Sequence, residues 1–477
     1  MTGNVFAQGL GILVAPILTR LFAPEAFGVA ALFSSITAIF GVVACLRYEL
    51  SIMLPKTDEE ATNLLGVSIL SVLAITAIAA LTIFVAKGPI VRLLNAPELS
   101  KYIWLIPPAV LISGVFLALN YWNSRTKNFG QLSIARVVSS VSTNVAKLGA
   151  GFAGFVSGGV LIGASIIGQF VSTSILGSQI WRDDRSLFKG SIRWKKMIAE
   201  VKRHKKFPIY STWSALLNTT SQQLPIWILA FYFLPTVVGF YALGMAVLSL
   251  PMNLLGSAIA QVFFQKAVET HNRTNELPRV VEELFKRLVS LSIFPILLLT
   301  IVGKDVFIVA FGARWAEAGV YVQILALWIF FRFISSPIST LFSVLEKQGS
   351  ALLFNGILLV IRATSLIIGG MSGDIRFTLL LFASTGVVCY GFLCFWLLSS
   401  AKVPLNWALY YLNKCAVFCL PMLGITILAK WGFGLNPLGV SLIGFLGAIP
   451  YYVIILKQDK ELQGPVQIFL QCFRFIK

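Results

Sequence analysis

The sequence predicts an all-α, polytopic integral membrane protein with about fourteen transmembrane helices, arranged as two parallel six-helix repeats plus two C-terminal helices. Three observations predict this fold. Hydrophobic residues make up 57% of the 477 residues and charged residues only 12%, whereas a soluble domain carries about 25% charged residues. Apolar stretches of about 17 to 25 residues, the length that crosses a bilayer, recur along the whole chain. An internal repeat relates the first part of the chain to the second.

The predicted spans leave no room for a soluble domain of ordinary size. The first eight cover residues 3–20, 27–46, 63–86, 102–121, 132–154, 159–181, 208–231 and 236–258. The next six cover residues 287–303, 319–343, 351–370, 376–399, 410–429 and 437–456. None of the 19 acidic residues of the chain lies inside these spans. Any charge at membrane depth is therefore positive.

The connections between the spans carry most of the net charge of +19. Lys and Arg concentrate in alternate connections, as the positive-inside rule requires, and this pattern places both termini in the cytoplasm. The most basic connection, 182–207, includes Lys195, Lys196, Lys202 and Arg203. Membrane topology and contact with anionic lipids explain this charge better than a dedicated ligand site. Nucleic acid is not an expected partner.

No metal site, cofactor or catalytic group is expected. His204 and His271, the two histidines of the chain, both lie in cytoplasmic connections, so no metal site can be assembled locally. The cysteines inside spans are more typical of small apolar helix residues than of ligands. A cleavable signal peptide is not expected either, because the N-terminus lacks a positively charged leading region.

An internal repeat divides the chain. The pattern P-x-x-x-G-x-x-A-L occurs at 24–32, between spans 1 and 2, and again at 235–243, between spans 7 and 8. A fainter correspondence joins 94–98 to 311–315 in the same order. Because each copy contains six spans, the second copy keeps the orientation of the first, which makes the repeat parallel. The predicted domains are an N-terminal six-helix lobe (1–181), a basic cytoplasmic connection (182–207), a C-terminal six-helix lobe (208–400), and two extra helices with a cytoplasmic tail (401–477).

Three cations fall at membrane depth: Lys147, Arg332 and Arg362. Each costs about 2.5 to 3.5 kcal/mol at mid-bilayer. Lys147 and Arg362 lie on corresponding spans, about 22 Å and 16 Å from the cytoplasmic helix ends, and are expected to face one cleft; Arg332 lies about 18 Å deep from the other side. The alternative for each cation is a structural role, in which it snorkels or bonds backbone carbonyls. An anion-binding cavity explains the three together better, and the planar fork of Arg suits phosphate.

Two further groups are candidates for transport roles. Span 7 carries Asn218, Thr219, Gln222 and Gln223, which suit hydrogen bonding to sugar hydroxyls and equally suit helix packing. Pro337 follows Arg332 and loosens its helix, which favours gating. Arg47 and Glu49 follow span 2; an ion pair at the helix end is the preferred interpretation, and ion coupling is the alternative.

The chain resembles a known family at several motifs. These are Leu-Thr-Arg-Leu-Phe-Ala-Pro-Glu-Ala-Phe-Gly at 18–28, Arg-Tyr-Glu-Leu-Ser-Ile-Met-Leu-Pro-Lys at 47–56 followed by Asp-Glu-Glu-Ala at 58–61, Arg-Phe-Ile-Ser-Ser-Pro at 332–337, and the end of span 8 through Lys266. The sequence is similar to the polysaccharide or O-antigen flippases of the multidrug/oligosaccharidyl-lipid/polysaccharide exporter superfamily.

The resemblance implies a function as well as a fold. The cargo would be an oligosaccharide linked to undecaprenyl diphosphate, which alternating access moves from the cytoplasmic to the periplasmic leaflet of the bacterial inner membrane. Such a protein is not an enzyme, and it usually works beside a polysaccharide polymerase. Lys147, Arg332 and Arg362 would supply the cationic lumen of the family.

Two alternative functions fit the sequence less well. A multidrug exporter of the same superfamily would be expected to carry acidic residues within its spans, and this sequence has none there. A membrane polysaccharide polymerase or glycosyltransferase needs a substantial extramembrane loop for catalytic acids. The largest external connections, near 87–101 and 304–318, are short.

Overall fold

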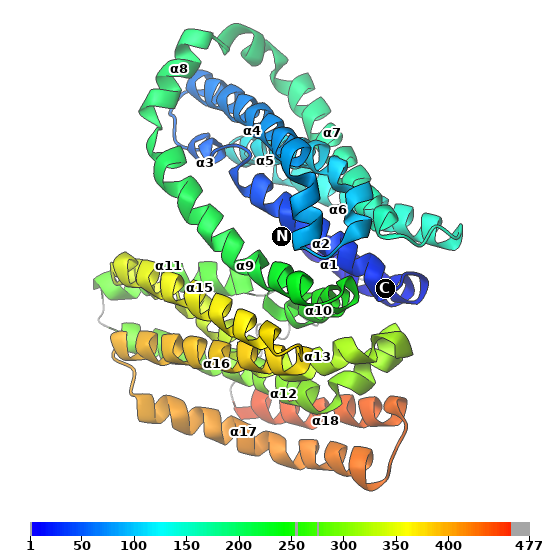
Figure 1. Cartoon of the computed structure of the whole chain (residues 1–477). Helices are drawn as coiled ribbons and strands as arrows, with labels where there is room; N and C mark the ends of the chain where they lie inside the picture. The colour runs from blue at the N-terminus through cyan, green and yellow to red at the C-terminus, as the bar shows by residue number, and fades with distance from the viewer. Residues whose placement is uncertain (1, 253–255, 274–275, 459–477) are drawn as a thin grey trace. The chain divides into compact units, whose positions relative to one another are not determined.

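A computed structural model describes residues 2–252, 256–273 and 276–458, and this part of the chain is helical and contains no β-strand (Figure 1). The helices up to residue 232 are α1 (Thr2–Leu21), α2 (Pro24–Val43), α3 (Tyr48–Ser51), α4 (Asp58–Leu93), η1 (Pro97–Lys101), η2 (Ile103–Leu105), α5 (Ile106–Arg125), α6 (Phe129–Phe152), α7 (Gly158–Ser191), α8 (Trp194–Arg203), η3 (Phe207–Ser211) and α9 (Thr212–Tyr232). The remainder are α10 (Pro235–Leu248), α11 (Ser257–Arg273), α12 (Leu277–Phe311), η5 (Ala313–Trp315), α13 (Ala316–Ile338), α14 (Leu341–Val344), α15 (Gln348–Met371), α16 (Ile375–Ser400), α17 (Leu405–Ile427), η6 (Leu428–Gly432) and α18 (Pro437–Gln458).

The predicted class, an all-α polytopic membrane protein, is confirmed. Within the described residues, ten helices are long and apolar enough to cross a membrane, and two shorter apolar helices cover Phe6–Leu21 and Pro235–Leu248. The other two predicted spans correspond to α6 and α9, which have 24 and 21 residues. These two helices are not among the ten, because they carry the polar residues discussed below.

The helices differ in extent from the predicted spans. Helix α4 has 36 residues and α12 has 35, so both continue well beyond the spans predicted at 63–86 and 287–303. Hydropathy detects only the apolar section of each helix, whereas the helix itself continues into more polar residues. The span predicted at 236–258 is divided instead, because α10 ends at Leu248 and α11 begins at Ser257.

The chain forms two compact units, Met1–Ala242 and Leu243–Lys477. Helix α9 packs against α2 in the first unit, where Trp227 Nε1 donates a hydrogen bond to Ser35 Oγ over 2.9 Å. The division into lobes at 1–181, 182–207, 208–400 and 401–477 stays a prediction. Residues 459–477 of the predicted tail lie outside the described residues.

The two copies of the repeated P-x-x-x-G pattern contact each other in the first unit. A Cβ atom on Gly28 would lie 1.9 Å from the carbonyl oxygen of Pro235, and one on Gly239 would lie 2.0 Å from that of Pro24. Only glycine permits this approach at either position. Thr236 Oγ1 also donates to Glu25 Oε1 over 2.8 Å. The N-terminal ends of α2 and α10 therefore cross backbone against backbone.

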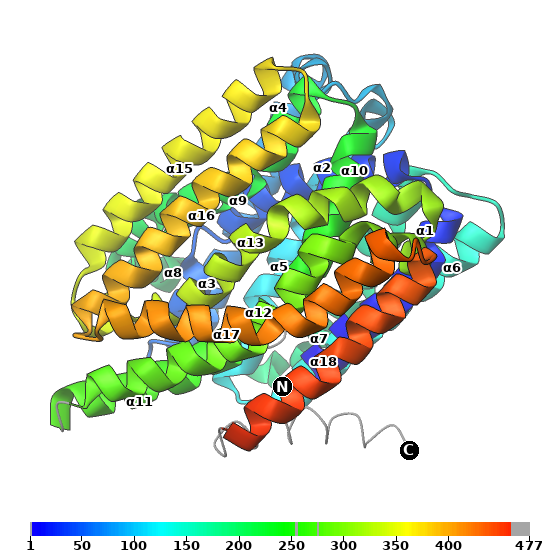
Figure 2. The ribbon, with the colours of Figure 1, turned by 90° about the horizontal axis from the view of Figure 1, so that it is seen from below.

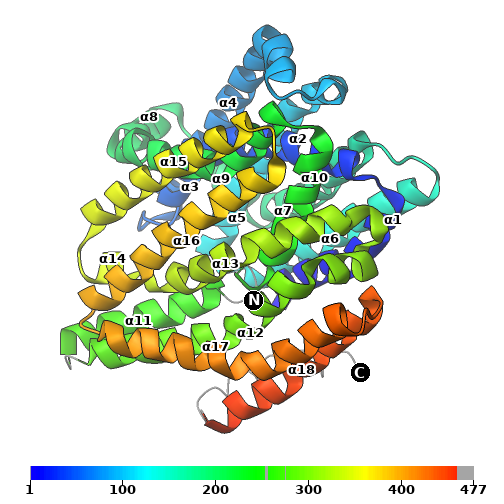
Figure 3. The same ribbon diagram turned by 60° about the horizontal axis from the view of Figure 1, so that its bottom comes forward.

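In the second unit, α12, α13 and α16 provide most of the buried core. Helix α16 packs against α13, and α15 runs beside α16; α17 and α18 pack together against α12 (Figures 2 and 3). Lys430 of η6, the segment that directly follows α17, connects to α12: its Nζ lies 2.7 Å from Asp305 Oδ2 and donates to the carbonyl oxygen of Ile301.

Candidate anion-binding site

Two of the three predicted cations, Arg332 and Arg362, meet on one aromatic ring in the second unit. Trp328 and Arg332 are one helical turn apart on α13, so their side chains share a face. The guanidinium carbon of Arg332 lies 5.7 Å from the centre of the Trp328 ring. The guanidinium carbon of Arg362, from α15, lies 6.0 Å from the same ring. Cation–π contacts of this kind contribute about 0.5 to 2 kcal/mol each.

Arg362 is held from a second side by α16. It is buried, with 7% of its surface exposed, and its Nη2 donates a hydrogen bond of 2.8 Å to Tyr390 Oη. Its guanidinium carbon also lies 5.8 Å from the Tyr390 ring. Ser335 Oγ donates to the carbonyl oxygen of Tyr390 over 3.0 Å. Helices α13, α15 and α16 thus fix the position of this guanidinium together.

A glycine on α16 makes room for the Trp328 ring. A Cβ atom on Gly386 would lie 2.3 Å from Trp328 Cδ1, so any side chain there would collide with the indole. Phe382, one turn earlier on α16, contacts the ring edge on, with centroids 4.7 Å apart. Because Gly386 and Tyr390 are also one turn apart, a single face of α16 seats both aromatic groups of the site.

The arrangement suits an anion. Aromatic rings attract a guanidinium without neutralising its charge, and among the described residues Arg332 has no hydrogen bond or ion pair. Two like charges near one ring repel each other, and an anion between them would relieve that repulsion. Arg332 is only partly buried, which leaves donor groups for a ligand. Bidentate binding to phosphate is the chemistry that this pair can offer.

Lys147, the third predicted cation, lies in the first unit on α6. Its side chain is partly buried, and the structure shows no hydrogen bond or ion pair for it within the described residues. Arg136 precedes it by eleven residues, which is three helical turns, so the two cations share one stripe of α6. Arg136 is also partly buried and likewise has no such partner in the described part of the chain.

The polar residues of α9 divide into two stripes. Asn218 and Gln222 are exposed, and Gln222 Nε2 donates to Asn218 Oδ1 over 3.3 Å. Thr219 and Gln223 are partly buried on the neighbouring stripe. Exposed amides are unfavourable against lipid, so these residues suit contact with water or a polar cargo.

Arg47 lies at the end of the turn after α2, and Glu49 lies in the short helix α3 that follows. Arg47 has a left-handed backbone, with φ of 63°, and so does Leu46, with φ of 49°. Arg47 Nη1 lies 3.5 Å from Glu49 Oε1. Glu49 is fully buried, and neither carboxylate oxygen has a hydrogen-bond partner within the described residues. Burial raises the pKa of this carboxyl group above its usual value.

Pro337 lies in the last turn of α13, which ends at Ile338, and the short helix α14 follows.

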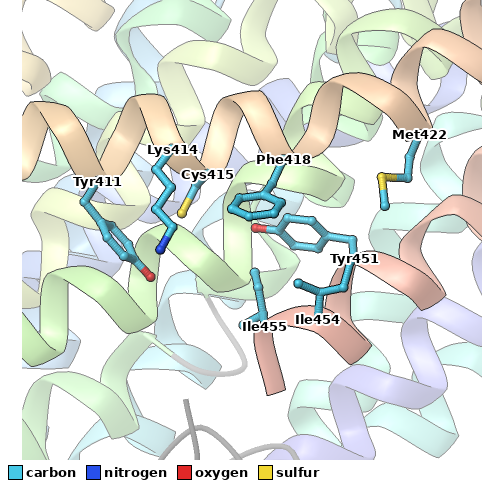
Figure 4. Close-up of a pocket in the computed structure, with 8 residues that line it drawn as sticks. All are labelled: Tyr411, Lys414, Cys415, Phe418, Met422, Tyr451, Ile454 and Ile455. Atoms are coloured by element: carbon cyan, nitrogen blue, oxygen red, sulfur yellow. The ribbon is translucent and has the colours of Figure 1, made fainter. Parts of the chain in front are cut away.

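A pocket of about 30 Å³ lies between α17 and α18, enough for about one water molecule (Figure 4). Aromatic and aliphatic side chains line it, with Lys414 at one side. Within the described residues, no cluster of three or more His, Cys, Asp or Glu side chains is placed to hold a metal ion.

Sequence reasoning missed four residues that this geometry brings forward: Trp328, Tyr390, Gly386 and Arg136. A sequence signal existed for Trp328 and Arg332, which are four residues apart, and for Arg136 and Lys147, which are eleven apart. Gly386 and Tyr390 show the same four-residue spacing. Which face of α16 meets α13 is a tertiary property, so that pairing had no signal in the sequence.

Comparison with known proteins identifies the family. A family model described as polysaccharide biosynthesis protein matches residues 17–320, which is more than half of the chain. The chain belongs to this family. The resemblance stated from the sequence motifs is confirmed at this level.

Two relatives in this group are transport or biosynthesis proteins of bacterial polysaccharides. The lipopolysaccharide biosynthesis protein WzxC of Escherichia coli (strain K12) is 22% identical over 383 residues, which are 79% of this chain and 75% of the relative. The succinoglycan biosynthesis transport protein ExoT of Rhizobium meliloti (strain 1021) is 24% identical over 353 residues, which are 72% of this chain and 67% of the relative.

Solved structures share the fold. The lipid II flippase MurJ in an inward closed conformation matches with a TM-score of 0.75 and 14% identity, over 96% of this chain and 98% of that chain. A multidrug resistance MATE family transporter of the MOP superfamily, in an inward-facing conformation, matches with a TM-score of 0.65 and 14% identity, over 84% of this chain and 95% of that chain. The chain therefore has the fold of these membrane transporters.

Proposed function

We propose that the protein is a flippase that moves oligosaccharide linked to undecaprenyl diphosphate from the cytoplasmic to the periplasmic leaflet of a bacterial inner membrane. The observation that carries the proposal is the pair of guanidiniums, Arg332 and Arg362, gathered on Trp328 inside membrane helices. A diphosphate is the anionic part of such a cargo. Membership of a polysaccharide biosynthesis family supports the choice of glycan.

Each part of the cargo has a proposed partner. The diphosphate binds Arg332 and Arg362, and Lys147 adds a point charge that attracts the same group. The sugar hydroxyls contact the amide and hydroxyl groups of Asn218, Thr219, Gln222 and Gln223. The polyprenyl chain stays in the lipid. No bond is broken in this sequence of events, so the protein acts as a transporter and not as an enzyme.

Alternating access is the proposed mechanism, with both termini in the cytoplasm. The two repeats would move against each other, and the crossing of Gly28 and Gly239 is a contact between their corresponding motifs. Pro337 and the turn at Arg47 and Glu49 are the proposed gating elements. A membrane potential that is negative inside favours export of an anion by about 2.3 kcal/mol per charge per 100 mV.

A multidrug exporter is the second candidate, because the fold is shared with a multidrug transporter. Organic cations would meet Arg332 and Arg362 with like charge, which opposes their binding. The site therefore favours the anionic cargo. A polysaccharide polymerase is the proposed functional partner, acting on the glycan after it is flipped.

The test depletes the protein in its own cells and measures which leaflet holds the lipid-linked glycan. A flippase leaves the glycan in the cytoplasmic leaflet, where it is protected from an external glycan-modifying reagent. Glycan that reaches the periplasmic leaflet at the normal rate but stays unpolymerised would contradict the proposal and would point to a defect in polymerisation. Re-expression of the wild-type chain is the control.

A further inference from the structure

Helix α8 (Trp194–Arg203) presents three chemically distinct sides, and the first is docked on the protein. Met197 and Glu200 are buried, and Gly66 of α4 admits Met197, whose Cε would lie 3.0 Å from a Cβ at that position. At the start of α4, Glu59 binds Lys196, and Glu60 accepts a hydrogen bond from Arg203 Nη1 over 3.0 Å. Figure 1 shows α8 beside this end of α4.

Asn63 of α4 fixes the approach to this helix. It is fully buried, its Nδ2 donates to the carbonyl oxygen of Ser191 over 3.0 Å, and its Oδ1 accepts from the backbone nitrogen of Arg193 over 3.0 Å. The residues just before α8 are therefore tied to α4 by their backbone. The rotation of α8 about its own axis is set by these contacts, so its other two sides have defined directions.

The second side is apolar and uncovered. Trp194 is 66% exposed, Ile198 41% and Val201 36%, and their spacing of four and three residues places them on one stripe. Further exposed aromatic side chains stand before and after the helix, at Trp181 and Trp213. Aromatic residues collect at the headgroup level of a bilayer because their rings are amphipathic. An apolar stripe bordered by such residues is typical of a helix in the membrane interface.

The third side is cationic. Lys195 and Lys202 are exposed, seven residues apart, and neither has a hydrogen bond or ion pair within the described residues. Lys189, Lys205 and Lys206 repeat this state in the flanking segments. Lys196 and Arg203 differ from them, since both are engaged with α4. The basic residues of this connection therefore form two groups. Lys196 and Arg203 pair with acidic residues of α4, whereas Lys195 and Lys202 are exposed and accessible to a ligand.

We propose that α8 lies in the interface of the cytoplasmic leaflet and binds acidic phospholipid, with the stripe of Trp194, Ile198 and Val201 among the acyl chains and Lys195 and Lys202 on the headgroups. Charge complementarity decides for acidic lipid, because each Lys near an anionic surface gains affinity by about fivefold. The inference does not depend on the cargo of the transporter.

The test uses the full chain in detergent, titrated with phosphatidylglycerol or phosphatidylcholine, and follows the midpoint of thermal unfolding. Phosphatidylglycerol stabilises the wild type more than phosphatidylcholine does. The double variant Lys195→Gln, Lys202→Gln requires about 30-fold more phosphatidylglycerol for the same stabilisation at low salt. The matched control is Arg92→Gln, Lys101→Gln, which removes the same charge from exposed positions elsewhere in the first unit and responds as the wild type does.

A second measurement reads the helix itself. Hydrogen–deuterium exchange in lipid nanodiscs shows slower exchange of residues 194–203 with phosphatidylglycerol than with phosphatidylcholine, and Trp194→Gln weakens this protection. Equal responses to the two lipids in the wild type would overturn the proposal and would leave the surface to an acidic protein. Equal losses in the Lys195/Lys202 variant and the Arg92/Lys101 control would overturn it as well.

Discussion

The cations that the sequence singles out have different surroundings in the two units. In the second unit, aromatic rings hold Arg332 and Arg362. In the first unit, Lys147 has no hydrogen bond or ion pair among the described residues, and Arg47 faces the carboxylate of Glu49. A carboxylate cancels the charge of its partner, whereas a ring keeps it available. In the proposed function, Arg332 and Arg362 are oriented for an anion, Lys147 is an unoriented point charge, and Arg47 is paired with Glu49.

The largest expected effect follows from removing the oriented pair. The double variant Arg332→Gln, Arg362→Gln loses two charge-assisted donors worth about 1.5 to 3 kcal/mol each. Export of glycan to the cell surface, normalised to protein level, should fall by at least about 100-fold. Arg92→Gln, an exposed arginine outside the site, is the control and should export normally. Normal export by the double variant would show that Arg332 and Arg362 are not needed for cargo transport.

The seat of Trp328 gives the next largest effect. Gly386→Ala introduces a Cβ 2.3 Å from the indole, and overpacking of this kind costs about 1 to 3 kcal/mol. Thermal unfolding in detergent should show a lower midpoint, and cargo affinity should fall because both guanidiniums rest on the displaced ring. Gly356→Ala on α15 is the matched control, since a Cβ there has no neighbour within 4 Å. Equal behaviour of the two variants would show that the ring does not position the cations.

Lys147 should matter less than the arginine pair. As a point charge without fixed donors, it contributes about 1 kcal/mol, so Lys147→Gln should weaken cargo binding by about fivefold. Lys147→Arg should bind as the wild type does, whereas Arg332→Lys should not. Binding measured on the purified variants separates the two positions. If binding responds equally to the Lys/Arg exchange at Lys147 and at Arg332, the two cations do not differ in how their donor groups are oriented.

The smallest effect concerns the neutralised pair. Burial raises the pKa of Glu49, so the folded protein binds this proton more tightly than the unfolded chain does. The charged carboxylate destabilises the fold fully above the folded pKa, and the penalty disappears as the pH falls through that pKa. Glu49→Gln should therefore raise the midpoint of thermal unfolding near neutral pH, and the gain should shrink in acid.

A matched variant checks the Glu49 prediction. Glu98→Gln changes an exposed carboxylate and should leave the midpoint unchanged across the same pH range. A lower midpoint for Glu49→Gln at neutral pH would mean that the pairing with Arg47 outweighs the burial of the charge. In that case the ion pair between Arg47 and Glu49 would stabilise the folded protein.

Some of this comparison was predictable from the sequence. Lys147, Arg332 and Arg362 could be identified from the sequence alone, because each is a charge inside an apolar stretch. The predicted spans contain no acidic residue. The repeated P-x-x-x-G pattern could also be identified, because it is a match between two short stretches of sequence. The close backbone approach at Gly28 and Gly239 explains why both copies carry glycine. Helix extents were less accessible: α4 and α12 continue past their apolar sections, where hydropathy carries no signal.

The environment of each cation could not be predicted. That Trp328 supports two arginines depends on how α13, α15 and α16 are rotated against one another, and Gly386 acquires its role only from that packing. The burial of Glu49 depends on the left-handed turn at Leu46 and Arg47. The sequence does not predict this turn, because glycine is the residue typical of a left-handed backbone and neither position is glycine. Contact with a neighbouring helix is a property of the assembled fold, not of the local pattern.

Whether Arg332 and Arg362 bind the diphosphate is decided by the dissociation constant of undecaprenyl diphosphate for the purified protein. It is measured for the wild type, for Arg332→Gln with Arg362→Gln, and for Lys147→Gln. We expect affinity to fall by at least about 100-fold for the arginine pair and about fivefold for Lys147→Gln. A larger loss for Lys147→Gln than for the arginine pair, or unchanged binding in both, would show that the arginine pair is not the diphosphate site.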